Sequence, residues 1–138
     1  MIDVQPDPKP ERRKGNAPRR IVDPVAIRMK MATELECRAG CGRRADSAHH
    51  LIQKGAPHFG DDVMGNIVGV CGHGTAGCHG AIHGNPYVDQ DGERWTTERV
   101  AAAIGETLTA PEIAYFLQKL GRDAGIEFLA RHYHRRLV

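Results

Sequence analysis

Thiol and imidazole side chains gather in one stretch of this chain. All four cysteines and six of the eight histidines lie between positions 37 and 83. Both groups bind transition metals well, and here the two kinds of ligand come in separately spaced sets. The clustering therefore predicts two metal sites, one made of thiolates and one made of imidazoles.

The thiolate set consists of two pairs, which is how two separate turns supply the four ligands of a tetrahedral Zn²⁺ ion. The pairs are Cys37 with Cys41, and Cys71 with Cys78. A chain with 5% aromatic residues and sixteen glycines builds only a thin core, so we expect a structural zinc site of four cysteines to support it. His73, between the second pair, could replace one thiol, and four unrelated buried thiols are the alternative.

The imidazole set begins with the adjacent pair His49-His50 and ends with a His79-x-x-x-His83 spacing. Residues four apart share one face of a helix, so His79 and His83 can bind the same ion. The zinc helix of a metalloprotease has this spacing but needs a glutamate where this chain has Gly80, which argues against peptidase chemistry. The third ligand is then His49 or His50. Neighbouring strand residues point to opposite faces, which favours one histidine as ligand and the other as a metal-free base.

Taken in order, these residues resemble an HNH endonuclease of the ββα-metal superfamily. The resemblance covers about residues 34–86, and the stretch 74–86 is especially similar to bacteriophage members. The matching parts, in chain order, are Cys37-x-x-x-Cys41, Ala48-His49-His50, Asn66, Cys71, Cys78-His79 and His83.

The resemblance implies a function and a role for each residue of the site. His49, His79 and His83 would hold one catalytic divalent ion, which could be Mg²⁺, Mn²⁺, Zn²⁺ or Ni²⁺. His50 would be the general base, and Asn66 would brace the hairpin through backbone hydrogen bonds. The implied activity is a metal-dependent DNA endonuclease, in which water activated by His50 attacks a metal-bound phosphate and leaves a 5′-phosphate and a 3′-hydroxyl.

The elements that position these residues predict an α+β fold, with a small ββα-metal (HNH) core, zinc knuckles, an N-terminal helix and a C-terminal helical segment. Asp23-Pro24 is typical of a helix start and predicts an amphipathic helix over 24–35. Strands are expected over 45–52 and 67–70, followed by a short helix over 75–83.

From Thr97 onward the composition favours helices. We expect one helix over 97–104, closed by Gly105. The sequence Thr109-Ala-Pro-Glu112 is a capping box that opens a second helix, which should end at Gly121. A third helix should start at Asp123.

This organisation predicts three parts: a flexible basic arm over 1–22, the nuclease core with its zinc site over 23–86, and a helical extension over 87–138. A net charge of +2 is too small to argue for nucleic acid, so the position of the basic residues matters more. A solvated tail is the alternative for the arm. The residues that we expect to contact DNA phosphates are Arg12, Arg13, Lys14, Arg19 and Arg20.

The same sequence sets expectations for location and partners. No run of 18 apolar residues is present, which argues against a membrane span, and residues 1–15 have no apolar segment of a secretory signal. We therefore expect a cytoplasmic protein, in the host cytoplasm if it is phage-encoded, with DNA as its partner. A zinc-stabilised nucleic-acid-binding module without turnover is one alternative, although the metal-free histidine of the pair argues against it. An accessory protein of a phage DNA-packaging machine, in contact with terminase proteins, is another.

Overall fold

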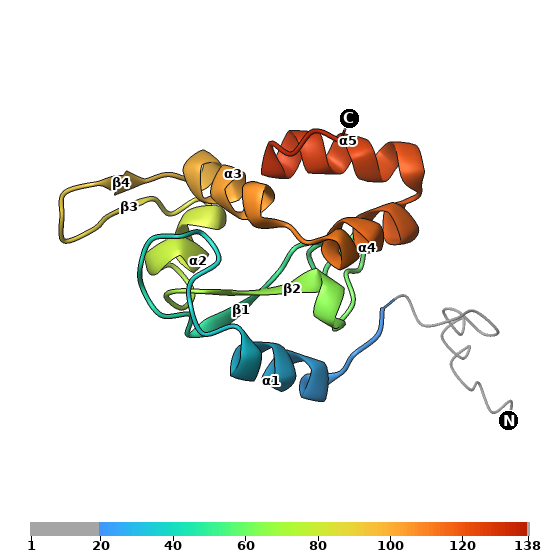
Figure 1. The fold of residues 1–138 in the computed structure, drawn as a ribbon, viewed down its shortest axis with the longest axis horizontal. Helices are drawn as coiled ribbons and strands as arrows, with labels where there is room; N and C mark the ends of the chain where they lie inside the picture. The colour runs from blue at the N-terminus through green and yellow to red at the C-terminus, as the bar shows by residue number, and fades with distance from the viewer. Residues whose placement is uncertain (1–19, 138) are drawn as a thin grey trace, which may run out of the picture.

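The computed structural model describes residues 20–137 and combines helices with small antiparallel sheets (Figure 1). These residues form five α-helices, one short 3-10 helix and two sheets of two strands each. The predicted mixture of helix and sheet is confirmed. Within the described residues no helix is both long enough and apolar enough to cross a membrane. Four of the predicted phosphate contacts lie outside this part of the chain, namely Arg12, Arg13, Lys14 and Arg19.

The adjacent histidines lie on a β-hairpin. Strand β1 (Ser47–His50) pairs antiparallel with β2 (Ile67–Val70), and His50 stands opposite Ile67. Strand β1 is shorter than the predicted span 45–52. After His50 the chain leaves the ladder, because the backbone N–H of Ile52 donates to the side-chain oxygen of Asn66 (2.7 Å) instead of to a strand. Asn66 ends the 3-10 helix η1 (Met64–Asn66), which leads directly into β2.

Helix α2 (Gly77–Ile82) follows the hairpin and carries Cys78 and His79. It begins two residues later than the predicted start, and His83 is its C-cap. Gly77 has φ +62°, a conformation that other residues rarely adopt. A Cβ at Gly80 would lie 2.2 Å from the carbonyl carbon of Thr75, so no side chain fits beside His79. The position that would carry a protease glutamate is therefore closed by packing.

Between α2 and the C-terminal helices lies a small second hairpin. Its strands are β3 (Tyr87–Val88) and β4 (Arg94–Trp95), which pair antiparallel before the C-terminal helices begin. Trp95 is buried and stacks on the ring of Tyr87, with the ring centroids 6.3 Å apart.

Three C-terminal helices complete the fold: α3 (Thr97–Thr107), α4 (Ala110–Leu120) and α5 (Arg122–Tyr133). The capping box of α4 forms as the sequence predicts. Helix α3, however, continues through Gly105. A Cβ at Gly105 would lie 2.0 Å from the carbonyl oxygen of Tyr133, so this glycine permits close packing of α3 on α5 and does not end the helix. Figure 1 shows α3, α4 and α5 on one side of the β1–β2 hairpin and α1 (Pro24–Thr33) on the other.

Buried side chains from both halves of the described chain form a single core. Phe116 of α4 and Leu129 of α5 are fully buried in the same cluster as Val68 of β2 and Leu51, which follows β1. The C-terminal helices therefore pack on the hairpin that carries the histidines.

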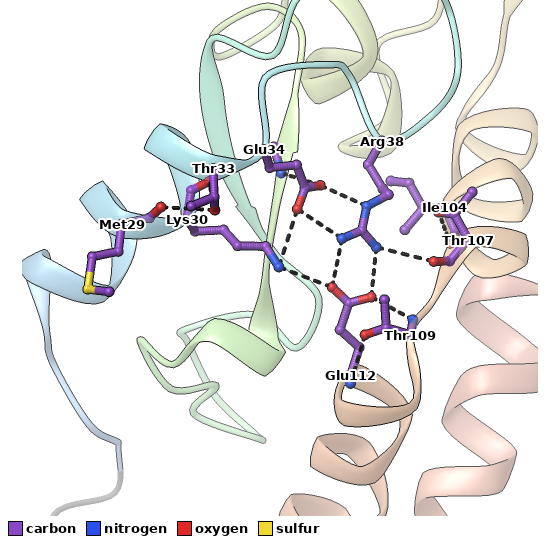
Figure 2. A network of polar contacts seen from close by, with 10 residues as sticks. Met29, Lys30, Thr33, Glu34, Arg38, Ile104, Thr107, Thr109 and Glu112 are labelled. Carbon is purple, nitrogen blue, oxygen red and sulfur yellow. Dashed lines mark hydrogen bonds and ion pairs between the residues drawn. The ribbon is translucent and has the colours of Figure 1, made fainter.

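Polar contacts hold α1 in place (Figure 2). Arg38, within the first cysteine turn, donates to both carboxylate oxygens of Glu112 on α4 (2.7 and 2.9 Å) and pairs with Glu34. Lys30 of α1 lies 3.4 Å from Glu112 and 3.2 Å from Glu34. Ala26 is the buried residue of α1, so the amphipathic helix predicted over 24–35 depends more on this ion network than on an apolar face. Glu112 is only 1% exposed and joins α1, the cysteine turn and α4.

Candidate functional site

Three imidazoles converge where the hairpin meets α2. The ring nitrogens of His49, His79 and His83 that face one another all lie within 4.8 Å. The ring centroids are 5.8 Å apart for His49 and His79, 5.4 Å for His49 and His83, and 5.1 Å for His79 and His83. The structure therefore brings together the three residues that the resemblance names as ligands, and it leaves His50 out of this group.

Tyr133, the last residue of α5, fixes the tautomer of His49. Its hydroxyl donates its only proton to the carbonyl oxygen of Leu51 (2.6 Å), so the same oxygen must accept from Nε2–H of His49 (3.2 Å). Neutral His49 then carries its lone pair on Nδ1. That atom is buried and has no hydrogen-bond partner within the described structure. A buried nitrogen lone pair among two other imidazoles is what a metal ligand needs.

Ser47 fixes the tautomer of His79 in the same way. The Ser47 hydroxyl donates to the carbonyl oxygen of Gly72 (2.5 Å) and lies 2.7 Å from Nδ1 of His79. Nδ1 of His79 is therefore the protonated nitrogen, and Nε2 carries the lone pair. His83, the C-cap of α2, is exposed, which gives the cluster an open side.

The charge state of the cluster also suits a cation. Burial is the main cause that keeps the pKa of His49 well below its ordinary value, and the neighbouring His83 and His79 lower it further. Burial and His83 likewise lower the pKa of His79. Both rings therefore stay neutral at neutral pH, and neutral imidazole is the form that binds metals. The donor set fits a divalent transition-metal ion.

His50 faces a different partner. Its Nε2 lies 2.7 Å from Oδ1 of Asp62, and its side chain is 8% exposed. Because an ionised carboxylate can only accept, Nε2 of His50 carries the proton and Nδ1 carries the lone pair. Burial lowers the pKa of His50 while the bond to Asp62 raises it, and the net shift is downward. His50 is thus a neutral imidazole with a basic nitrogen, next in sequence to His49 but outside the cluster of three imidazoles.

Asn66 joins the two ends of the loop between β1 and β2. Its side-chain N–H groups donate to the carbonyl oxygens of Ile52 (3.1 Å) and Asp61 (2.9 Å), and its own backbone carbonyl accepts from Leu51 N–H (2.8 Å). Asn66 is fully buried, and its side chain bonds backbone groups. It thereby fixes the path of the chain directly after His50 and at Asp61 without reaching the imidazole cluster.

The four thiols form a second cluster. The sulfur atoms of Cys37, Cys41, Cys71 and Cys78 all lie within 4.8 Å of one another. The Cys41 and Cys71 sulfurs are 3.6 Å apart, which is too long for a disulfide of about 2.05 Å. It is close to the roughly 3.8 Å that separates two sulfurs bound at about 2.3 Å to one tetrahedral zinc ion. His73 is exposed and outside this group.

The thiols compete for protons when no cation is bound. A hydrogen bond from Cys78 lowers the pKa of Cys37 to about 5, while the same bond and burial raise the pKa of Cys78. Burial raises the pKa of Cys41 to about 11. A bound zinc ion would remove this competition by holding all four sulfurs as thiolates. The cluster is therefore a possible structural metal site.

Arg20, which the sequence predicted as a contact to DNA phosphates, is bonded within the fold. Its Nε donates to the carbonyl oxygen of Gly60 (2.9 Å), and a terminal nitrogen pairs with Asp62. Its side chain is 21% exposed. Arg20 is therefore part of the structure around His50 within the described residues.

Sequence reasoning did not single out the partners of the histidines. Ser47, Asp62 and Tyr133 are common residue types, and two of the three lie far along the chain from the histidine they contact. Tyr133 is 84 positions from His49, and Ser47 is 32 positions from His79. Only Asp62, within the loop that follows His50, could have been found by asking which carboxylate lies near His50 in the sequence.

A cavity of about 420 Å³ lies against the cluster. His49 and Tyr133 form part of its wall, together with the apolar side chains of Leu51, Ile82 and Phe128. Nε2 of His49 is bonded to Tyr133, another residue of this wall, whereas Nδ1 is the ring nitrogen without a hydrogen bond among the described residues.

Comparisons with protein families, with curated proteins and with solved structures find no match to this chain.

Proposed function

We propose that this chain is a metal-dependent DNA endonuclease with a ββα-metal core of the HNH type. The observation that carries the proposal is the arrangement of four imidazoles on a β-hairpin and the helix that follows it. Three of them, His49, His79 and His83, converge with ring nitrogens within 4.8 Å. The fourth, His50, points to Asp62 and keeps a basic Nδ1. Metal-assisted hydrolysis uses a bound metal ion together with a base that takes a proton from water, and these four histidines would supply both.

The division of labour follows from the tautomers. A divalent ion held by His49, His79 and His83 would stabilise negative charge on a phosphate oxygen and on the departing 3′-oxygen. His50 accepts a proton from the attacking water at Nδ1, because Nε2 already carries a proton that is bonded to Asp62. Asn66 keeps the loop beside His50 in a fixed path.

The proposed structural zinc at the four thiols serves this site indirectly. Cys71 directly follows β2, and Cys78 directly precedes His79 on α2. Backbone N–H of Cys78 donates to the Cys71 sulfur (3.3 Å), and backbone N–H of His79 donates to the Cys71 carbonyl (3.0 Å). A metal at the thiols would thus set the position of α2 against the hairpin.

The test is a plasmid-nicking assay of the full chain with Mg²⁺, Mn²⁺, Zn²⁺ and Ni²⁺ supplied separately. We expect the wild type to nick DNA only with added divalent metal. His50→Ala should keep metal binding and DNA affinity but lose turnover by roughly two to four orders of magnitude, the usual contribution of a general base. His49→Ala should instead weaken metal binding, so that excess metal restores part of the cleavage.

His73→Ala is the matched control, because His73 is exposed and belongs to neither cluster. It should cleave like the wild type. A wild-type protein that binds DNA and metal but never cleaves under any of these ions would contradict the proposal and leave a zinc-stabilised binding module. If His50→Ala loses the metal while His49→Ala keeps it, the two histidine roles are reversed.

A further inference from the structure

Two adjacent carboxylates, Asp61 and Asp62, are buried beside the proposed base. Asp61 is 6% exposed and Asp62 is 4% exposed. Buried carboxylates are costly unless several donors satisfy them, and both of these residues have such donors. Their partners differ: the Asp62 carboxylate bonds His50, whereas the Asp61 carboxylate bonds groups outside the site.

Asp62 accepts hydrogen bonds from two groups besides the proposed base. Its Oδ2 accepts from backbone N–H of Asp23 (2.9 Å), and Oδ1 pairs with the Arg20 guanidinium. Oδ1 also lies 2.7 Å from Nε2 of His50. Burial would raise the pKa of Asp62, but hydrogen bonds from Asp23 N–H and His50 hold this pKa below its ordinary value. Asp62 is therefore a fixed, ionised acceptor.

Asp61 supports the same region without touching the base. Its Oδ1 accepts from backbone N–H of Ile21 (2.6 Å), and its Oδ2 accepts from the Tyr115 hydroxyl (2.7 Å) and from Lys119 (2.9 Å). Asp61 thus ties the segment at 20–23 to α4. It shares with Asp62 its burial and its role in anchoring that segment, and it lacks the bond to His50.

We propose that Asp62 is the positioning residue of His50, and that Arg20 acts through Asp62 by holding its carboxylate in place. The inference rests on the proposed function, because it assigns Asp62 a part in the same hydrolysis. Asp62 accepts the Nε2 proton of His50, which restricts the ring to one tautomer and one orientation and leaves Nδ1 as the basic nitrogen. Arg20 was predicted from the sequence to contact a DNA phosphate. In the structure it pairs with Asp62, so its role in the site is to hold that carboxylate.

The size of the effect is bounded by the base itself. A residue that acts only through His50 cannot contribute more than His50 does, and a general base contributes about 10²- to 10⁴-fold. Partners that orient a metal-bound imidazole are typically worth about 10- to 100-fold, and we take the same range for the partner of the metal-free His50. We therefore expect Asp62→Asn to lower kcat by about 10- to 100-fold.

Asparagine keeps the shape of Asp62 but replaces one acceptor oxygen with an NH₂ donor. His50, Arg20 and Asp23 N–H all donate to this carboxylate, so one of them must then face a donor. The full-length chain carrying Asp62→Asn should therefore lose kcat with little change in KM or in metal content. Arg20→Gln should show a smaller loss of the same kind.

Asp61→Asn is the matched control, since it perturbs the same anchored segment but not His50. It should lower the melting temperature about as much as Asp62→Asn and keep kcat within about threefold of the wild type. In a His50→Ala background, Asp62→Asn should have no further effect on kcat, because the group through which it acts is gone. Equal loss of kcat in Asp61→Asn, or an undiminished effect of Asp62→Asn without His50, would overturn the inference.

The ring nitrogens of His50 provide a readout that does not depend on turnover. Nitrogen-15 chemical shifts of the wild type should show Nε2 protonated and Nδ1 unprotonated, and Asp62→Asn should populate the other tautomer. A wild type without cleavage but with this tautomer pattern would contradict the proposed function alone. A cleaving wild type whose His50 tautomer and kcat are unchanged by Asp62→Asn would overturn the inference alone.

Discussion

Replacing Tyr133 with phenylalanine tests whether the last helix takes part in metal binding. The substitution removes one oxygen from a buried ring and leaves the apolar packing in place. Two hydrogen bonds are lost, one to the Leu51 carbonyl (2.6 Å) and one from Nε2–H of His49 (3.2 Å). His49 is then left with a buried N–H that has no acceptor.

The expected magnitude follows from these two bonds. A buried donor without a partner costs about 1–3 kcal/mol. His49 can escape part of that cost by moving its proton to Nδ1, but the buried Nδ1 then has no lone pair to offer a metal ion. Loss of a partner that orients a ligating histidine typically weakens metal binding by about 10- to 100-fold. At about 1.4 kcal/mol for each factor of ten, that range matches the cost of the unsatisfied donor.

The assay is a Co²⁺ titration of protein whose thiol site is already filled with zinc, followed by visible absorption. An imidazole site gives the absorption of Co²⁺ without a thiolate charge-transfer band, so the two clusters are distinguished. Tyr115→Phe is the control, because the Tyr115 hydroxyl is also partly buried and bonds Asp61 (2.7 Å) but no metal ligand. Both variants should lose stability, and only Tyr133→Phe should lose Co²⁺ affinity. Equal affinity in Tyr133→Phe and the wild type would refute the role of Tyr133.

Three further predictions concern the thiols, the arm and the ion network. Cys71→Ser should give insoluble or molten protein, while the purified wild type should hold about one tightly bound zinc per chain at the thiols, as measured by mass spectrometry and near-ultraviolet circular dichroism. Deleting residues 1–19, which keeps Arg20, should reduce the slope of log affinity against log salt concentration by about 0.9 for each phosphate that the arm neutralises. DNA binding measured by fluorescence anisotropy at several salt concentrations gives this slope, and an unchanged slope would make the arm a solvated tail. Burial would raise the pKa of Glu112, but hydrogen bonds from Arg38 and from Thr109 N–H keep it below the ordinary value of 4.5. The contribution of Glu112 to stability is therefore complete above pH 4.5 and is lost as the pH falls through the lower folded-state pKa. Glu112→Gln should therefore lower the free energy of unfolding at pH 7 by about 3 kcal/mol and remove this acid dependence, which denaturant titrations at several pH values would measure.

Much of the site could be predicted because its chemistry is carried by rare residue types. Cysteine and histidine are uncommon enough that their clustering between 37 and 83 points to metal ligands before any fold is known. The capping box at Thr109 could be predicted as well, since its hydrogen bonds span three residues. Features whose residues lie close together in the sequence can thus be predicted from the sequence.

The rest could not be predicted, because it depends on contacts between distant residues of ordinary type. Nothing near Tyr133 in the sequence indicates that its hydroxyl reaches His49. Gly105 is typical of a helix stop, and only the position of α5 shows that it is a point of close packing. Arg20 resembles one more cation of a basic arm, until the fold places Asp62 beside it.

The neighbouring positions of Cys78 and His79 have a consequence for the order in which the two proposed sites fill. Both residues lie in the six-residue helix α2, which is too short to be stable without external support. A zinc ion at the thiols would fix this helix and thereby bring His79 and His83 toward His49, so the first ion would lower the entropic cost of binding the second. Loading should then be sequential and cooperative. A chelator strong enough only for the imidazole ion should leave the fold intact, whereas removal of the thiol ion should abolish both sites together.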